Sequence, residues 1–592
     1  MLRGSLPRFL FIAPAIAACT GEISGADPGA GFCEAPQTCF ELCLCADGDP
    51  VRCKRACGDD ISPQPDPTPG AGGYTGSGAT SGGGGTAGGG ASAGGGGTAS
   101  GGGNAGGGGG GGTPGAGGGS GPLAASGELA RGLAIQSVAI YQGTKVELFS
   151  GTTAVSDRNA PVVTGRPALV RVFVKPDPGF TTREIVARVD LGNGPTLDAK
   201  RTVSAASGDT SLDSTFNIQV PAARITAGAT IAVSLLEAEG STASGSSNGA
   251  RAPSSGDAPL GAQSAGAGLE VVLVPIIVGG ITPDTSPARQ KEYEDHLYKL
   301  YPVSDVQISV REPITYGGSV AGTSGGSWNA VLDQLLSVRA ADKPESRTYY
   351  FGLLTPQQSF SQYCSGGCIA GLSPVAGAND VWARGSIGLG FFPTGGYPGS
   401  LDTMAHEIGH AHGLPHAPCG TSNAGPFPYA GGKIGAWGYD LLAQKLIDPD
   451  KTKDVMSYCD PTWFSDYNFG KLFARQQHVH AVQNMIVTDP ERMPGRYLTL
   501  LIDEDGQVSW GQPKDLTSSP LGPKRVVALR DANGNLLGNV SGFDYPTSHH
   551  AGSLVLIRES SFSGFRGARS VHPSGAWMTP LPPAQALGSV RK

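Results

Sequence analysis

The sequence predicts an α+β fold in which a central segment of mixed helices and strands lies between two strand-rich regions. Short runs rich in Val and Ile, separated by Gly, Pro, Asn and Asp, recur over residues 128–251 and again after about residue 496. Between these regions, apolar runs of strand length alternate with stretches of helical periodicity. With 592 residues the chain is too long for one domain, so we expect several units.

The chain begins like an exported protein. A positively charged start leads into a short apolar stretch that ends in Ile16-Ala17-Ala18-Cys19. This ending resembles the lipobox of bacterial lipoproteins, in which the cysteine becomes the acylated first residue of the mature protein. We therefore expect residues 1–18 to be a lipoprotein signal peptide. Cys19 would then anchor the protein in the bacterial cell envelope, at the outer membrane or cell surface, from which it could also be released. The alternative is an ordinary signal peptide, with Cys19 incidental.

The number of cysteines supports export. The chain has 11 Cys, and assigning one to lipid leaves an even number for disulfide bonds. Besides Cys19, six cysteines crowd into residues 19–57 and predict a small disulfide-bonded module; zinc binding is the alternative, although this cluster contains no His. These six are Cys33, Cys39, Cys43, Cys45, Cys53 and Cys57. The other four, Cys364, Cys368, Cys419 and Cys459, lie near the His-rich segment described below.

Residues 58–127 are expected to form a disordered spacer, because Gly dominates them together with Ala, Ser and Thr. Residues 128–262 predict a β-sandwich. Their Val- and Ile-rich runs have the length of strands, turn residues separate the runs, and no helical periodicity competes. We find no residues in this region that suggest chemistry.

Residues 263–490 have the mixed pattern. Residues 269–278 and 348–354 are nearly continuous apolar runs, which predict buried strands. A polar cap candidate followed by proline predicts a helix that begins near residue 287. Apolar residues at a period of 3.6 predict a second helix over residues 327–339.

Residues 491–592 are strand-like again and predict a small C-terminal β-domain. Residues 503–506 and 531–534 have the acidic start of a calcium-binding loop. A calcium loop of this type needs an acidic twelfth position, where this chain has Lys514 and Gly542. We therefore expect two hairpin turns rather than calcium sites.

The most informative segment runs from His406 to His416. His406 and His410 are four residues apart, so on a helix they lie on one face and their imidazoles can bind one metal ion. Gly413 is suited to end the helix, because glycine enters the left-handed region without strain. The chain can then turn back and bring His416 to the same ion. Three imidazoles leave a fourth position open for water, which is typical of a catalytic Zn²⁺ site, and Glu407 points towards that water.

This pattern, His-Glu-x-x-His-x-x-Gly-x-x-His, resembles that of the metzincin clan of zinc peptidases. The clan has a second signature, a Met-containing turn beneath the zinc, and Met456 stands forty residues after His416. Tyr458 matches the Met-x-Tyr form of astacin-like and serralysin-like members, in which the Tyr reaches the metal or the oxyanion. The resemblance covers about residues 269–487. It includes a strand expected over residues 387–392, which matches the family's substrate-binding edge strand.

The resemblance implies a zinc metalloendopeptidase with a metzincin-like catalytic domain of mixed sheet and active-site helix, flanked by β-sandwich-like domains. It implies one catalytic Zn²⁺ on His406, His410 and His416, with Glu407 as general base and Tyr458 as either a catalytic helper or a wall of the site. Within the clan it suggests a relationship to bacterial mucin-cleaving peptidases, although the residue after the third His does not settle the subfamily. We expect the substrate to be an extracellular protein or glycoprotein.

The remaining histidines of this half of the chain are expected to stay outside the chemistry. His412 lies off the face that carries the predicted ligands and is expected to be a bystander. His478 and His480 are two residues apart on a helix, and we expect both at the surface. His549 and His550 are adjacent in a loop and are expected to be inert.

The four cysteines near the motif allow three pairings. We favour Cys419 with Cys459, because this bond would tie the metal helix to the Met-turn. That choice leaves Cys364 to pair with Cys368 across three intervening residues.

Charge and hydropathy exclude several kinds of partner. The net charge is -7 and no Lys/Arg cluster occurs, so we expect no nucleic-acid binding. No run of 18 apolar residues follows the N-terminus, so we expect membrane contact through the lipid anchor alone. We also expect the protein to be a monomer. One alternative function is a surface adhesin or glycan-binding protein on a peptidase scaffold, against which the intact Glu407 argues. Another is a zinc peptidase of a different clan, with a downstream Glu as third ligand, against which His416 argues.

Overall fold

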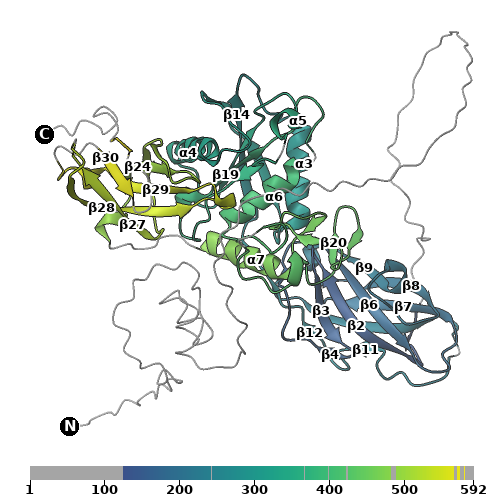
Figure 1. Cartoon of the computed structure of the whole chain (residues 1–592). Coiled ribbons are helices and arrows are strands. Elements are labelled where there is room, and N and C mark those ends of the chain that lie inside the picture. The colour runs from purple at the N-terminus through teal and green to yellow at the C-terminus, as the bar shows by residue number, and fades with distance from the viewer. Residues whose placement is uncertain are drawn as a thin grey trace, which may run out of the picture.

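Three regions follow one another along the chain in the computed structural model (Figure 1). The structure describes residues 125–241, 243–365, 367–397, 399–421, 424–481, 489–531, 533–565, 570–573 and 579–580. The expected signal peptide, the lipidated Cys19, the six-cysteine module and almost all of the spacer lie outside these residues. Within the described residues, no helix has the length and apolar character needed to cross a membrane.

The N-terminal region consists of two antiparallel sheets that share one hydrophobic core. The first sheet has the order β1 (Ala125–Leu129), β10 (Thr230–Ala238), β7 (Arg183–Asp190), β8 (Leu197–Val203), and the short strands β11 (Arg251–Ala252) and β12 (Ala258–Pro259) also pair with β10. The second has the order β4 (Thr153–Ala154), β3 (Lys145–Ser150), β2 (Leu133–Tyr141), β6 (Ala168–Pro176), β9 (Phe216–Val220). A parallel pair, β5 (Val162–Val163) and β13 (Ala262–Gln263), completes the region. The Val- and Ile-rich runs form strands as the sequence predicts, because their branched side chains fill the space between the sheets.

The central region is built on a mostly parallel sheet. Its order is β15 (Val306–Val310), β14 (Leu269–Val278), β17 (Tyr349–Leu354), β19 (Gly385–Leu389), β18 (Gly371–Leu372), with β16 (Ile314–Tyr316) also paired to β14. Side chains alternate along β14: Val271 and Leu273 face one layer, and Val274 and Ile276 face the other. The sheet is therefore buried on both faces, which explains why its strands are continuous apolar runs.

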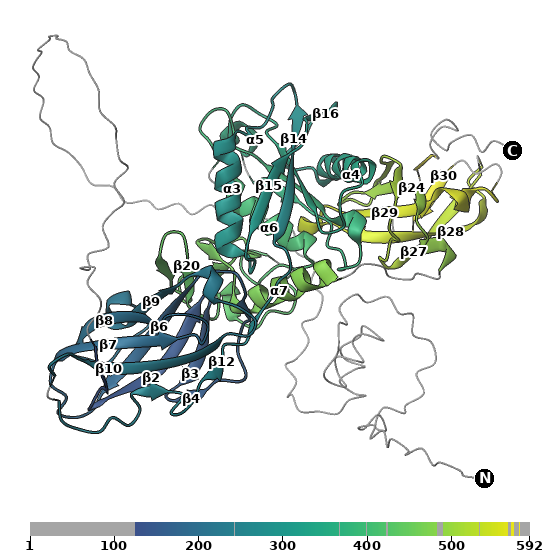
Figure 2. The same cartoon turned by 180° about the vertical axis from the view of Figure 1, so that it is seen from behind.

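Helices cover both faces of this sheet (Figure 2). One face packs against α4 (Gly325–Asp342), and the other packs against α3 (Pro287–Leu300) and α6 (Ser400–Ala411). The predicted helix start is confirmed, since α3 has Pro287 in its first turn and Ser286 at its N-cap. Two further helices are α5 (Phe360–Tyr363) and α7 (Asp466–Ala481).

The prediction that residues 387–392 form the edge strand of the sheet is wrong in one respect. The strand near residues 387–392 exists as β19, but it pairs with β17 on one side and with β18 on the other, so it is internal. The edge is β18, which runs antiparallel to β19. A strand of two residues has no periodicity, so the sequence carries no signal for it.

The C-terminal region is an antiparallel sheet. Its order is β25 (Val508–Trp510), β24 (Gly495–Ile502), β29 (Ser553–Arg558), β28 (Leu536–Pro546), β27 (Lys524–Arg530), β30 (Ser570–Pro573), β31 (Thr579–Pro580), with β26 (Lys514–Leu516) also paired to β24. Both expected hairpin turns are confirmed. The Asp503 amide donates to the Gln507 carbonyl at 3.0 Å, and the Asp531 amide donates to the Asn535 carbonyl at 3.0 Å.

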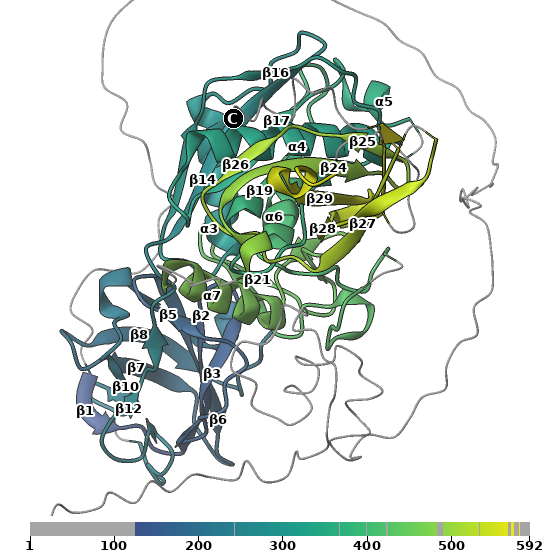
Figure 3. The ribbon, with the colours of Figure 1, turned by 90° about the vertical axis from the view of Figure 1, so that its left-hand side faces the viewer.

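This C-terminal sheet packs directly on α4 (Figure 3). Trp328 and Leu332 of α4 share a hydrophobic core with Tyr497 and Leu556 of the sheet. Asp333 of α4 forms a buried ion pair with Lys514, and the Asn329 side-chain amide donates to the Ala551 carbonyl. The core is thus continuous across residue 490, where the sequence suggested a domain boundary.

The remaining small strands frame the segment after α6. They are the antiparallel pair β20 (Gly438–Asp440) and β21 (Lys445–Ile447), and the parallel pair β22 (Lys453–Asp454) and β23 (Thr462–Trp463). Trp463 donates its indole N–H to the Gly143 carbonyl at 2.8 Å, and the buried Arg166 donates to the Val303 carbonyl at 2.7 Å. These bonds attach the N-terminal sheets to the central region.

Candidate metal centre and active site

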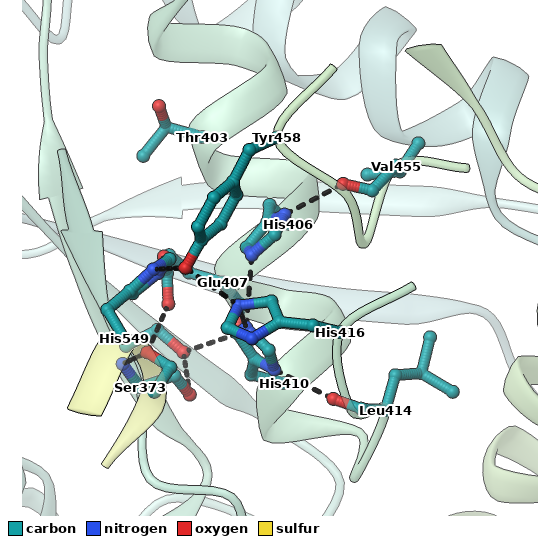
Figure 4. Close-up of polar contacts among 12 residues, drawn as sticks. Ser373, Thr403, His406, Glu407, His410, Leu414, His416, Val455, Tyr458 and His549 are labelled. Carbon is teal, nitrogen blue, oxygen red and sulfur yellow. Dashed lines mark hydrogen bonds and ion pairs between the residues drawn. The ribbon is translucent and has the colours of Figure 1, made fainter. Parts of the chain in front are cut away.

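Helix α6 and the segment after it bring three histidines to one point (Figure 4). His406 and His410 lie one turn apart on α6, and their Nε2 atoms are 3.0 Å apart. The Nε2 atom of His416 is 3.1 Å from that of His410. Ligands of a tetrahedral ion with bonds of about 2.0–2.1 Å are about 3.3 Å apart, so the three nitrogens fit one Zn²⁺ with little adjustment.

The opposite ring nitrogens of these histidines are held by backbone carbonyls. His406 Nδ1 lies 2.7 Å from the Val455 carbonyl, and His410 Nδ1 lies 2.7 Å from the Leu414 carbonyl. A carbonyl only accepts, so each Nδ1 carries the proton and each Nε2 presents its lone pair to the shared point. Metal-binding histidines commonly have this arrangement, which fixes both the tautomer and the ring orientation.

Burial keeps these rings neutral. It lowers the pKa of His406 to about 4. It also lowers the pKa of His410 well below its ordinary value, and the neighbouring His406 and His416 lower it further. Neutral imidazole is the form that binds a metal ion, so the site is prepared for one at neutral pH.

The chain reverses directly after α6, as the sequence predicts. Gly413 has a φ of 86°, in the left-handed region that favours glycine. Its amide donates to the His410 carbonyl at 2.7 Å, and the Leu414 amide donates to the Gly409 carbonyl at 3.0 Å. This helix ending carries the chain back, so that His416 reaches the Nε2 atoms of the helix.

Met456 lies beneath the metal helix. It is fully buried, and a Cβ atom added at Gly409 would come within 2.5 Å of its Sδ, so the thioether packs closely against the helix backbone. The Met456 carbonyl accepts from the Ala417 amide at 2.9 Å, which joins the turn to the segment of the third histidine. The Met456 amide donates to the buried carboxylate of Asp454 at 2.8 Å, and this carboxylate has its pKa raised by burial.

Two disulfides border the site, with the pairing favoured from the sequence. Cys419 and Cys459 are joined, with Cα atoms 5.8 Å apart, and Cys364 is joined to Cys368. The Tyr458 amide also donates to the Cys419 carbonyl at 2.9 Å. The segment after His416 and the segment after Met456 are therefore tied together beside the metal position.

Glu407 and Tyr458 both face the histidine cluster. Glu407 is almost completely buried, and Tyr458 is 47% exposed at the mouth of the site. The Tyr458 hydroxyl lies 3.1 Å from His416 Nε2. A carboxylate and a hydroxyl thus flank the point on which the three imidazoles converge.

His549 also lies in this site, so the expectation that it is inert was wrong. Its Nε2 is 2.7 Å from Glu407 Oε1, and its Nδ1 is hydrogen-bonded to the Tyr458 hydroxyl. With His406, His410 and His416 it forms a group of four histidines whose ligand atoms lie within 4.8 Å of one another. No spacing in the sequence connects His549 to the motif, because the contact depends on how the C-terminal sheet packs against the central region.

The other histidines have structural contacts. His412 is buried, its ring stacks on Tyr349 with ring centres 4.3 Å apart, and its Nε2 is 2.7 Å from the Gln476 amide, so it is a bystander as expected. His478 and His480 are only half-buried, but each has a partner in the protein, at Asn379 and at the Gly268 carbonyl. The expectation that both lie at the surface is therefore only partly met.

A cavity of about 950 Å³ opens at the candidate active site. Glu407 and Tyr458 line it, together with Gly371 of the edge strand β18, and Glu504 and His549 of the C-terminal region. Its walls therefore come from the central and the C-terminal regions, and it gives an extended ligand access to the histidine cluster.

Residues 324–469 match the model of the Peptidase M66 family. This M66 segment runs from the start of α4 into α7 and contains all three predicted ligands, Glu407, Met456 and Tyr458, but not His549. The match supports a metallopeptidase and agrees with the relationship to mucin-cleaving zinc peptidases suggested by the sequence.

A curated relative matches a short stretch of the chain. Dictomallein-1 of Dictyostelium discoideum is 32% identical over 99 residues, which are 16% of this chain and 16% of the relative. The chain thus spans about a sixth of the length of this relative.

Proposed function

We propose that this protein is a zinc endopeptidase of the metzincin type that hydrolyses peptide bonds of extracellular proteins or glycoproteins. The observation that carries the proposal is the convergence of three Nε2 lone pairs with a buried glutamate at the base of an open cavity. The M66 match over the same segment supports it. An adhesin on a peptidase scaffold would need the cavity but not the glutamate.

His406, His410 and His416 would hold the Zn²⁺. When bound, the ion supplies Lewis acidity towards the scissile carbonyl and lowers the pKa of the attacking water. Glu407 takes the proton from that water and passes it to the leaving amine. Tyr458 donates its hydroxyl proton to the oxyanion, because this hydroxyl lies beside the same Nε2 cluster and is open to the cavity.

The substrate chain would lie along β18. This strand is the free end of the central sheet as described, and its Gly371 lines the cavity beside Glu407. An extended peptide can add to such an edge through main-chain hydrogen bonds. The scissile bond is then presented to Glu407.

The place of action is part of the same proposal. The sequence features that support it are the lipobox ending at Cys19, the cysteine-rich module and the glycine-rich spacer. A lipid on Cys19 would hold the enzyme on the cell envelope, and a Gly/Ser-rich chain of about 70 residues would give it a reach of about 45 Å.

Metal analysis combined with a cleavage assay tests the proposal. The full chain, purified without chelator, is expected to contain one zinc and to cleave members of a peptide library and a glycoprotein. A chelator should abolish cleavage, and added zinc should restore it. Folded protein with far less than one zinc, or cleavage that ignores the chelator, would contradict the proposal.

A further inference from the structure

We propose that the C-terminal sheet completes the active site, and that His549 is a positioning residue that holds the Glu407 carboxylate and the Tyr458 hydroxyl in place for catalysis. This inference rests on the proposed peptidase function. It concerns residues 547–552, the C-terminal turn, which connects β28 to β29.

The C-terminal turn holds both oxygens of Glu407. His549 Nε2 lies 2.7 Å from Oε1, and the Ser548 hydroxyl donates to Oε2 at 3.1 Å. A carboxylate only accepts, so His549 Nε2 carries a proton, and the His549 Nδ1 atom is hydrogen-bonded to the Tyr458 hydroxyl. One imidazole therefore bridges the proposed base and the proposed oxyanion donor.

The position of His549 suits this bridging role better than metal binding. Both of its ring nitrogens already have partners, at Glu407 and at Tyr458. The Nε2 atoms of His406 and His416 lie 3.0 Å and 3.1 Å from that of His410, as expected for ligands of one ion. The three histidines of the motif are close enough to share an ion without it.

The C-terminal turn is fastened to the edge of the central sheet. The Ser548 amide donates to the Ser373 carbonyl at 2.8 Å, and the Ser373 amide donates back to the Ser548 hydroxyl at 3.0 Å. The Val375 amide donates to the Pro546 carbonyl at 3.0 Å. The turn is thus paired with the segment that directly follows β18, and it cannot shift without disturbing the substrate edge.

His549 has an unusual backbone conformation. Its φ of 58° lies in the left-handed region, which is uncommon for any residue with a side chain and costs about 1 kcal/mol or more. The same turn is also held by the Asn329 side-chain amide, which donates to the Ala551 carbonyl. Strained residues of this kind occur preferentially at functional sites.

Three substitutions in the full chain separate the two contacts of His549. His549→Gln retains a donor near the Nε2 position and so retains the contact with Glu407. His549→Asn retains a polar group near the Nδ1 position and so retains the contact with Tyr458. His549→Ala removes both contacts. Val526→Ala, at a 58% exposed position of the same sheet, is the control.

We expect His549→Ala to lower kcat by about 10- to 100-fold. KM should change by less than about threefold, and zinc content and Tm should stay close to those of the control. We expect His549→Gln to retain more activity than His549→Asn. A purely structural role would reverse this order, because Asn tolerates the left-handed conformation best of the three substitutes.

Two outcomes would overturn the inference. One is a kcat of His549→Ala equal to or above that of the wild type, which would mean that the turn is irrelevant or inhibitory. The other is a loss of zinc in His549→Ala, which would make His549 a ligand. Glu407→Gln, measured in parallel, separates the two proposals. If it cleaves at the wild-type rate, the peptidase mechanism fails; if it is inactive while His549→Ala is unaffected, only the present inference fails.

Discussion

Gly371→Ala is expected to disable the proposed general base without touching the metal ligands. Gly371 lies on β18, directly beside Glu407. A Cβ atom added there would come within 2.5 Å of Glu407 Cγ and 2.6 Å of Oε1. Carbon atoms in normal contact are about 3.5 Å apart, so the glutamate must move by roughly 1 Å.

Glu407 has little freedom to absorb this shift. Its backbone belongs to α6, and its two carboxylate oxygens are held by Ser548 and His549. A displacement of about 1 Å in a catalytic group can cost about 10²-fold in rate. We therefore expect kcat to fall about 100-fold, while overpacking lowers the free energy of unfolding by about 1–3 kcal/mol.

The assay measures peptide cleavage, zinc content and thermal unfolding of the variant together. Gly470→Ala is the matched control, because a Cβ added at this position in α7 has no atom within 4 Å apart from the backbone of its own helix and its chain neighbours. It should leave cleavage unchanged and stabilise the helix by about 0.5–1 kcal/mol. A Gly371→Ala variant that cleaves within twofold of the wild-type rate would refute the inferred position of Glu407.

Two further predictions concern contacts around the site, and a third concerns the expected lipid anchor. Asp454→Ala removes the acceptor of three buried donors and should lower the free energy of unfolding by about 3 kcal/mol. Chemical denaturation measures this change, and an unchanged midpoint would contradict the Met-turn contacts. Loss of the Cys419–Cys459 bond, which joins residues 40 positions apart, should lower the free energy of unfolding by about 3–4 kcal/mol. Turnover at low temperature should change much less. Peptide mapping without reduction checks the pairing, and a crosslink from Cys364 to either of these cysteines would rule it out. Cys19→Ser should release the protein from the membrane fraction, and unchanged retention would argue against a lipid anchor.

The elements that were predicted well are those with strong periodic or continuous patterns. The strand predicted over residues 269–278 coincides with β14, because a strand buried on both faces must be apolar throughout. Helix α4 extends the predicted residues 327–339 by a few positions at each end, where the apolar period is weakest. The short edge strand β18 could not be predicted, since two residues carry no pattern.

The same distinction applies to the site. His406, His410 and His416 could be grouped from the sequence because a helix and a turn relate them locally. His549 belongs to a different sheet, and its place beside Glu407 depends on the packing of that sheet against α4. An adjacent pair of histidines in a loop was the one available signal, and such a pair has no characteristic spacing to a metal motif.

In the proposed mechanism, Glu407 acts as the general base beside a zinc ion held by three histidines. Glu407→Gln isolates this role, because the amide preserves the shape of the side chain but cannot take a proton at neutral pH. We expect the variant to bind one zinc per chain and to lose peptide cleavage by roughly 10²- to 10⁴-fold. A zinc-loaded Glu407→Gln protein that cleaves peptides at nearly the wild-type rate would contradict this role.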